Sequence, residues 1–261
     1  MNETVGDHKD RVREQFGSTA QSYVDSPRHR SGGGLDQMVE LAEPKPEDAA
    51  LDIATGGGHT ALALAPHVGS IVASDLTPKM LQAAEAFIRG NNITNATFEI
   101  AEAEHLPFDA ESFDIVTCRI APHHFDDVPA FCREVARVLR HGGRFVLIDS
   151  LAPEDDDLDR FINEVEWRRD TTHVRSFRVS EWKSFVADAG LTVDVVETFE
   201  RRFEFDDWTA RSRMEPSDRD ELASLILNAS ARIKESYAVD ETDGRVESFA
   251  DKKFIMRARK A

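Results

Sequence analysis

The sequence predicts an α/β fold with an open, mostly parallel β-sheet covered by helices on both faces. Apolar runs alternate with helical stretches between residues 49 and 150. A parallel sheet buried on both faces gives such near-continuous apolar strands, because the connecting helices cover each side. The chain has 261 residues, 41% of them hydrophobic, so it can bury a sizeable core.

The elements follow one another in a regular order along the chain. Strands are expected at residues 50–55, 70–75, 96–102, 113–120, 144–150, 192–203 and 249–259. Helices are expected at residues 10–42 with breaks near residues 26–27 and 31–34, and at 59–66, 77–90, 128–140, 181–190 and 217–237, with one more after residue 150. The expected helix-end signals are Thr77 with Pro78, Gly90, Asp126 or Asp127, His141–Gly143, and Ser217 with Asp220.

The charge balance excludes one class of partner. Asp and Glu number 49 and Lys and Arg 32, which gives a net charge of −17. Such a surface repels the phosphates of DNA and RNA, so no nucleic-acid partner is expected. Only 8 of the 32 basic residues are Lys. An acidic, Lys-poor surface suits a salt-rich cytoplasm, where screening removes the self-repulsion; the alternative is an ordinary acidic cytosolic protein.

Other features favour a cytoplasmic location. The first residues hold no apolar segment of the kind found in secretory signals, and no apolar run approaches the ~20 residues of a membrane span. Cys118 and Cys132, without a CxxC spacing, are expected to be buried reduced thiols, and no metal site is expected. The sequence leaves a homodimer open.

Three glycines follow the first expected strand. Gly56, Gly58 and Ala61 fit the G-x-G-x-x-A pattern of dinucleotide-binding turns, and Asp75 ends the next strand, near where a ribose-binding acid belongs. A tight turn without a ligand, a nicotinamide or flavin dinucleotide, and S-adenosylmethionine are the three interpretations. Asp52, just before the glycines, disfavours a pyrophosphate, whereas it attracts an ammonium or sulfonium group. The alternative for Asp52 is a buried carboxylate hydrogen-bonded within the turn.

Longer motifs support S-adenosylmethionine. The segments LDIATGGG, ASDLTPKML, AEAEHLPFDAESFDIV and REVARVLRHGGRFVLID resemble the class I methyltransferases of the UbiE-like group, strongly over residues 10–180. The RDTTHVR and FGSTAQSYVDSPRH segments look like a small subgroup of unassigned methyltransferases. Ala54 stands where many class I enzymes have glycine, although UbiE-like members often have alanine there.

The resemblance implies a Rossmann-like sheet of seven strands with an antiparallel C-terminal strand. It also implies one domain over residues 1–261, with an N-terminal helical lid (1–48), a cofactor-binding core (49–150), an insertion forming a substrate lid (151–180), and C-terminal helices with the last two strands (181–261). S-adenosylmethionine would be the cofactor and S-adenosylhomocysteine the product. The expected cofactor-binding residues are Asp52, Ala54, Gly56, Gly58, Asp75, Leu76, Met80, Glu102, Ala103, Arg119 and Tyr23.

The resemblance gives several of these residues a role. Gly56 and Gly58 let the backbone approach the methionyl group, and the next helix N-terminus offers N–H groups to its carboxylate. Asp75 binds the ribose hydroxyls. The adenine is sandwiched by two residues and hydrogen-bonded by two others, namely Leu76 with Met80 and Glu102 with Ala103. Arg119 borders the methionine end.

The residues that would bind or deprotonate the methyl acceptor are less clearly indicated by the sequence. Methyl transfer needs alignment and exclusion of water more than a nucleophile, but a carbon or oxygen acceptor needs a base. The candidates follow the fourth and fifth strands or lie in the expected lid: His123, His124 and Asp149, then Arg169, Asp170, His173 and Arg175. For each, a purely structural role is the alternative. Phe16 and Tyr23 offer aromatic faces to a sulfonium, or pack the N-terminal helix on the core.

The sequence therefore predicts an S-adenosylmethionine-dependent methyltransferase that methylates carbon or oxygen of a small molecule. A NAD(P)-dependent oxidoreductase and a non-catalytic S-adenosylmethionine-binding module are the alternatives.

Overall fold

The computed structural model describes residues 5–25 and 34–261, and within them the chain divides into two compact units. Unit 1 comprises residues up to Asp149 together with Lys183–Glu197 and Ile255–Ala261, and unit 2 comprises Ser150–Trp182 and Thr198–Phe254. The predicted breaks near residues 26–27 and 31–33 lie outside the described residues.

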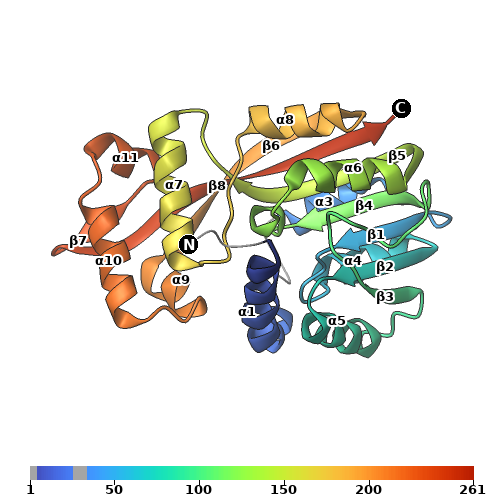
Figure 1. The fold of residues 1–261 in the computed structure, drawn as a ribbon, viewed down its shortest axis with the longest axis horizontal. Helices are drawn as coiled ribbons and strands as arrows, with labels where there is room; N and C mark the ends of the chain where they lie inside the picture. Colours follow the sequence, from blue (N-terminus) through green and yellow to red (C-terminus); the bar gives the residue numbers. More distant parts are fainter. Residues whose placement is uncertain (1–4, 26–33) are drawn as a thin grey trace. The chain divides into compact units, whose positions relative to one another are not determined.

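Unit 1 contains the alternation of strands and helices that the sequence predicts (Figure 1). Its first elements are α1 (Val5–Asp25), α3 (Leu35–Ala42), β1 (Ala49–Ile53), α4 (His59–Leu64), η1 (Ala65–His67), β2 (Ser70–Asp75) and α5 (Pro78–Gly90). They are followed by β3 (Ala96–Ile100), β4 (Phe113–Arg119), the turn η2 (Pro122–His124), α6 (Val128–Val138) and β5 (Leu139–Leu151), whose last two residues belong to unit 2.

The strands of the described residues form one sheet in the order β3-β2-β1-β4-β5-β8-β6. Strands β1 to β5 pair in parallel, with Ile53 of β1 opposite Cys118 of β4. The strand order reverses between β1 and β4. Strands β6 (Leu191–Glu204) and β8 (Arg245–Lys260) complete it, and the short β7 (Asp240–Thr242) pairs antiparallel with β8. The Rossmann-like, mostly parallel sheet with antiparallel C-terminal strands is therefore confirmed.

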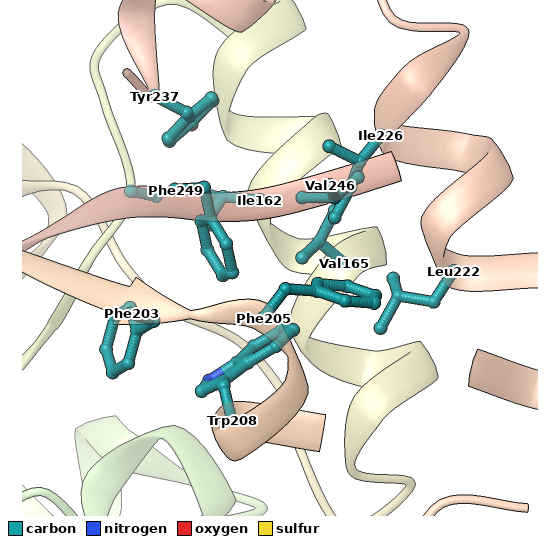
Figure 2. Packing of buried hydrophobic residues seen from close by; sticks show 11 residues of the cluster. Ile162, Val165, Phe203, Phe205, Trp208, Leu222, Ile226, Tyr237, Val246 and Phe249 are labelled. Atoms are coloured by element: carbon teal, nitrogen blue, oxygen red, sulfur yellow. The ribbon is translucent and has the colours of Figure 1, made fainter. Parts of the chain in front are cut away.

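Unit 2 is built around an apolar cluster of its own. It contains α7 (Asp156–Arg169), α9 (Phe205–Arg211), α10 (Pro216–Leu227) and α11 (Ala231–Ser236), and α8 (Val179–Asp188) begins in it. Figure 2 shows Phe203, Trp208 and Phe249 close together, and the Trp208 and Phe249 ring centroids are 4.7 Å apart. Leu222 and Ile226 of α10 and Ile162 and Val165 of α7 belong to the same cluster.

Some boundaries differ from the prediction. The helix expected at 128–140 ends at Val138, and β5 already starts at Leu139, so His141–Gly143 lie within a strand. The helix expected at 217–237 is two helices, α10 and α11, and the second is capped by Ser230, which accepts from the N–H of Ile233. The capping box at Ser217 was also wrong, because Pro216 already occupies the first turn, a position that suits proline.

Other local predictions are confirmed. Asp127 caps α6 by accepting from the N–H of Ala130 at 2.8 Å. Thr77 is the N-cap residue of α5, although its side chain makes no capping hydrogen bond. Cys118 and Cys132 are both buried free thiols, and burial raises the pKa of each.

Candidate functional site

The glycine loop, residues 54–58, joins the end of β1 to α4. The backbone is left-handed at Ala54, Gly56 and Gly58, with φ values of 51°, 56° and 82°. A Cβ on Gly56 would meet nothing within 4 Å, so the backbone at this position borders open space. A Cβ on Gly58 would lie 3.0 Å from Ile88 of α5, so this glycine also serves helix packing. The loop thus presents bare backbone at Gly56, as a closely approaching ligand requires.

Gly57 has a different role, which the sequence analysis missed. A Cβ there would lie 2.9 Å from the backbone carbonyl group of Tyr23, near the end of α1. His59, at the start of α4, reinforces this contact, since its Nε2 lies 3.0 Å from the Tyr23 carbonyl oxygen. The middle glycine of the GGG run therefore allows α1 to lie directly on the loop.

Asp52 lies beneath the loop and is 1% exposed. Its two carboxyl oxygens accept from the hydroxyl groups of Thr55 at 2.7 Å and Thr117 at 2.8 Å. Burial raises its pKa to about 6, in spite of these hydrogen bonds and the positive charge of Arg119. These contacts are those of a buried carboxylate that organises the turn, and direct contact with a cofactor stays a prediction.

Asp75 connects two parts of the site. It ends β2, and its carboxylate accepts from the N–H of Gly56 at 3.0 Å and from the N–H of Thr77 at 2.9 Å. Burial raises its pKa, against the effect of these two donors and of a hydrogen bond from the Thr77 side chain. A carboxylate has about four lone-pair sites, so Asp75 can also accept from a hydroxyl group of a ligand. Beyond it, Leu76 is half-buried and Met80 is buried.

Glu102 and Ala103 follow β3, where the adenine contacts were predicted. Glu102 is paired with Lys9 of α1 and with His105, whose Nδ1 lies 3.2 Å away. Lys9 also lies 3.6 Å from the buried Glu104. Burial opposes ionisation of Glu102, but Lys9 and His105 outweigh it, so the pKa of Glu102 is lowered. A nucleobase amine would have to share this carboxylate with Lys9, a partner that the sequence analysis did not foresee.

The aromatic side chains of α1 extend toward the turn after β4. The Phe16 ring lies 5.7 Å from the Tyr23 ring and 5.1 Å from the His124 ring, centroid to centroid. His124 in turn lies 4.2 Å from His123. Arg119, at the end of β4, donates from Nε to the Thr60 hydroxyl at 3.0 Å. The predicted residues of α1, β1, β2 and β4 therefore gather at the carboxyl ends of the central strands.

Asp149 and His123 form a close pair. Asp149, in β5, is fully buried, and its Oδ1 lies 2.5 Å from Nδ1 of His123. Asp149, His123 and His124 are all candidates from the sequence, but nothing in the sequence predicts that Asp149 and His123 pair. No local signal links the two residues, which are 26 positions apart, His123 in the turn η2 after β4 and Asp149 in β5.

The remaining acceptor candidates lie in unit 2 and are more buried than a solvated loop would be. His173 is 5% exposed, and its Nε2 lies 3.0 Å from the Asn163 side-chain oxygen. Arg175 pairs with the buried Asp159 at 2.8 Å. Arg169 stacks on Trp208, and Asp170 accepts from the Thr172 N–H at 2.9 Å. The segment is therefore held by contacts within unit 2, and its part in acceptor binding stays a prediction.

The described residues contain no group of three or more His, Cys, Asp or Glu side chains arranged to hold a metal ion. Within the same residues, no helix has both the length and the apolar character needed to cross a membrane.

A parallel sheet with a glycine loop after β1 and an acid after β2 defines the nucleoside-cofactor-binding α/β proteins. Residues 51–147 match a methyltransferase domain family. The uncharacterized methyltransferase YcgJ of Bacillus subtilis is 37% identical over 247 residues, which cover 94% of this chain and 97% of YcgJ. A structure from Bacillus halodurans, described as a methyltransferase, superposes with a TM-score of 0.86 at 39% identity, covering 88% of this chain and 99% of the other.

A demethylmenaquinone methyltransferase of Thermotoga maritima is 32% identical over 58% of this chain and 59% of its own length. The chain thus belongs to the S-adenosylmethionine-dependent methyltransferases, in the family of YcgJ and related to the UbiE group.

The described residues fit S-adenosylmethionine. The open space at Gly56 leaves room for a group packed against the backbone, and Asp75 keeps a lone-pair site for a ribose hydroxyl. The buried carboxyl group of Asp52 beneath the loop disfavours a doubly negative pyrophosphate, whereas it attracts a cationic group. The loop therefore suits a cofactor with hydroxyl and cationic groups better than a dinucleotide.

Proposed function

We propose that the protein methylates a carbon or oxygen atom of a small molecule. When bound, S-adenosylmethionine supplies a methyl group already activated by the sulfonium. The protein then has to hold the acceptor in line with this methyl group and exclude water.

The observation that carries this proposal is the position of α1 on the glycine loop. The helix contacts the loop closely at Gly57, and Phe16 and Tyr23 extend this cover toward His124. An acceptor that reaches the loop beneath such a cover has to be small. The net charge of −17 also disfavours a nucleic acid as acceptor.

Asp75 and Asp52 have separate roles in this proposal. Asp75 binds the ribose hydroxyls while it fixes the Gly56 backbone. Asp52 holds the loop through Thr55 and adds negative potential beneath the cationic end of the cofactor. Glu102, Ala103, Leu76 and Met80 border the base.

The proposal is tested by radiolabelled methyl transfer. The protein is incubated with S-adenosylmethionine labelled in the methyl group and a whole extract of the cells that produce it. Small molecules, RNA and protein are then separated, and the labelled product is identified by mass spectrometry. Label in the small-molecule fraction that depends on the intact protein supports the proposal, whereas label in protein or RNA, or no transfer at all, overturns it.

The Asp75→Ala variant serves as the control for cofactor dependence. It should lose transfer in proportion to its loss of S-adenosylhomocysteine binding, because the same carboxylate holds the ribose and the loop.

A further inference from the structure

The turn after β4 is held firmly against β5. Ile120 adopts a left-handed conformation, with φ of 56°, and its N–H donates to the carbonyl oxygen of Ile148 at 2.7 Å. This bond places η2 beside the next residue of β5, Asp149. His123 therefore meets Asp149 through backbone geometry and not through a flexible side chain alone.

Asp149 lowers the stability of the fold at this position. It is fully buried, and among the residues that the structure describes its Oδ2 has no hydrogen-bond partner. A buried carboxylate with an unsatisfied oxygen costs stability, and an apolar pair of similar volume would hold the turn at least as well. The fold alone does not account for the pair.

The pair also lies where the chemistry of the family takes place. In open α/β sheets, ligands bind beyond the carboxyl ends of the strands where the strand order reverses, which here is between β1 and β4. Asp52, Asp75 and Asp149 all act electrostatically on the buried Cys118 near the end of β4 and raise its pKa, after the larger effect of burial. The acid of the His123 pair thus lies at the same edge as the two acids of the cofactor site.

We propose that His123, oriented by Asp149, is the base that takes the proton of the methyl acceptor. The inference rests on the proposed function. An ionised carboxylate only accepts hydrogen bonds, so neutral His123 carries its proton on Nδ1, toward Asp149, and has its basic lone pair on Nε2. His123 is then the catalytic residue and Asp149 the positioning residue.

The step balances without any further reactant. The acceptor proton moves to Nε2 of His123, and the electron pair it leaves forms a bond to the methyl carbon. The bond between this carbon and sulfur breaks, and its electron pair stays on sulfur, which becomes a neutral thioether. The positive charge passes from the sulfonium to the imidazolium, where Asp149 stabilises it. The acceptor must therefore carry a removable proton, as a hydroxyl, phenol or activated C–H group does.

The groups around His123 are consistent with this role. His124 lies beside it on the same turn, Phe16 of α1 packs on His124, and Asp149 faces it from β5. The His123 side chain is only 12% exposed. A proton held here is screened from bulk water by aromatic rings.

The test compares His123→Gln and Asp149→Asn with wild type, and uses His67→Gln as the matched control. His67 is an exposed histidine in η1, where the chain from α4 returns to the amino end of β2. All four proteins should bind S-adenosylhomocysteine within about threefold of one another by calorimetry. Methyl transfer to the small-molecule fraction of the extract should fall ~100-fold or more in His123→Gln and stay unchanged in His67→Gln. The acid limb of the wild-type pH–rate profile should disappear in His123→Gln.

Asp149 is tested by nitrogen-15 NMR of the imidazole ring, which needs no acceptor. The wild-type His123 should be protonated at Nδ1 alone in its neutral form, and Asp149→Asn should show a mixture of the two tautomers. A mixture already present in the wild type would overturn the orienting role of Asp149.

The outcomes separate this inference from the proposed function. If the wild type transfers methyl groups to small molecules and His123→Gln does so at the same rate, the base is another residue and the proposed function stands. If the wild type binds S-adenosylhomocysteine but labels no small molecule, the proposed function fails and the catalytic role of His123 fails with it. If His123→Gln loses transfer but keeps the acid limb in its residual rate, His123 is structural.

Discussion

Replacing Asp52 with asparagine should change how the stability of the protein depends on pH. The carboxyl group is 1% exposed, and burial raises its pKa from the ordinary 3.8 to about 6. Between these two values the folded protein keeps a proton on Asp52 that the unfolded chain has already released. Because the folded state binds more protons there, stability falls as the pH rises through this window and levels off above it.

The size of the effect follows from the difference of about two pH units between the two pKa values. Each unit corresponds to about 1.4 kcal/mol, so the wild type should lose ~3 kcal/mol of unfolding free energy through this group between about pH 4 and pH 6. Asparagine does not ionise, and its amide can accept from one threonine hydroxyl and donate to the other. Asp52→Asn should therefore keep the turn but lose the pH dependence.

The assay is urea unfolding of wild type and Asp52→Asn at several pH values from about 4 to 7.5. Asp109→Asn, in an exposed position before β4, is the control for the loss of one negative charge. The stability of Asp52→Asn relative to wild type should rise by ~3 kcal/mol across the range, while that of the control stays nearly constant. A constant difference for Asp52→Asn would refute the raised pKa and the burial argument behind it.

Three further perturbations have definite expected results. Asp75→Ala should weaken S-adenosylhomocysteine binding by ~1–3 kcal/mol in calorimetry, and unchanged affinity would remove Asp75 from the site. Lys253→Met should lower the unfolding free energy by ~3–5 kcal/mol. The Lys253 Nζ lies 2.6 Å from the buried Asp251 carboxylate, which would lose its cation. A loss below about 1 kcal/mol in urea unfolding would contradict this. Gly57→Ala should speed amide hydrogen exchange in α1 and lower the unfolding free energy by ~1–3 kcal/mol, because the new Cβ would press on the Tyr23 backbone. Gly90→Ala is the control and should change neither, since a Cβ there would meet nothing within 4 Å. Equal exchange rates in the two variants would contradict the packing argument.

The parallel core and the glycine loop at its edge were predictable from the sequence because their signals are local. Each central strand is a run of apolar residues, and Gly56, Gly58 and Asp75 stand at strand ends, where the motif spacing fixes their neighbours. The left-handed backbone at Gly56 and the buried carboxylate of Asp75 are what these residue types suggest.

Other features depend on contacts between distant segments and leave no local signal. The pairing of His123 with Asp149 depends on the register of β4 and β5, and the pairing of Lys9 with Glu102 on where α1 docks. The early start of β5 was missed because residues 139–143 contain two glycines and polar side chains, which favour a turn until a partner strand is present. The helix expected at 217–237 is interrupted at residues 228–230, and Ser230 caps a second helix. Helix periodicity alone does not reveal this interruption.

The order in which the chain supplies unit 1 has a consequence for its synthesis. The unit is complete to Asp149 and then takes its last segments from residues 183–197 and 255–261, and β8 lies between β5 and β6 in the sheet. At a translation rate of about 5–20 residues per second, the hundred or so residues after Asp149 take roughly 5–20 s to emerge. During that time the edge of β5, which includes Asp149, is unpaired in the nascent chain because β8 has not yet been synthesised. An exposed edge of this kind invites pairing with other chains. Slow synthesis of residues 150–254 should therefore lower the yield of folded protein, and chaperones that cover nascent strands should restore it.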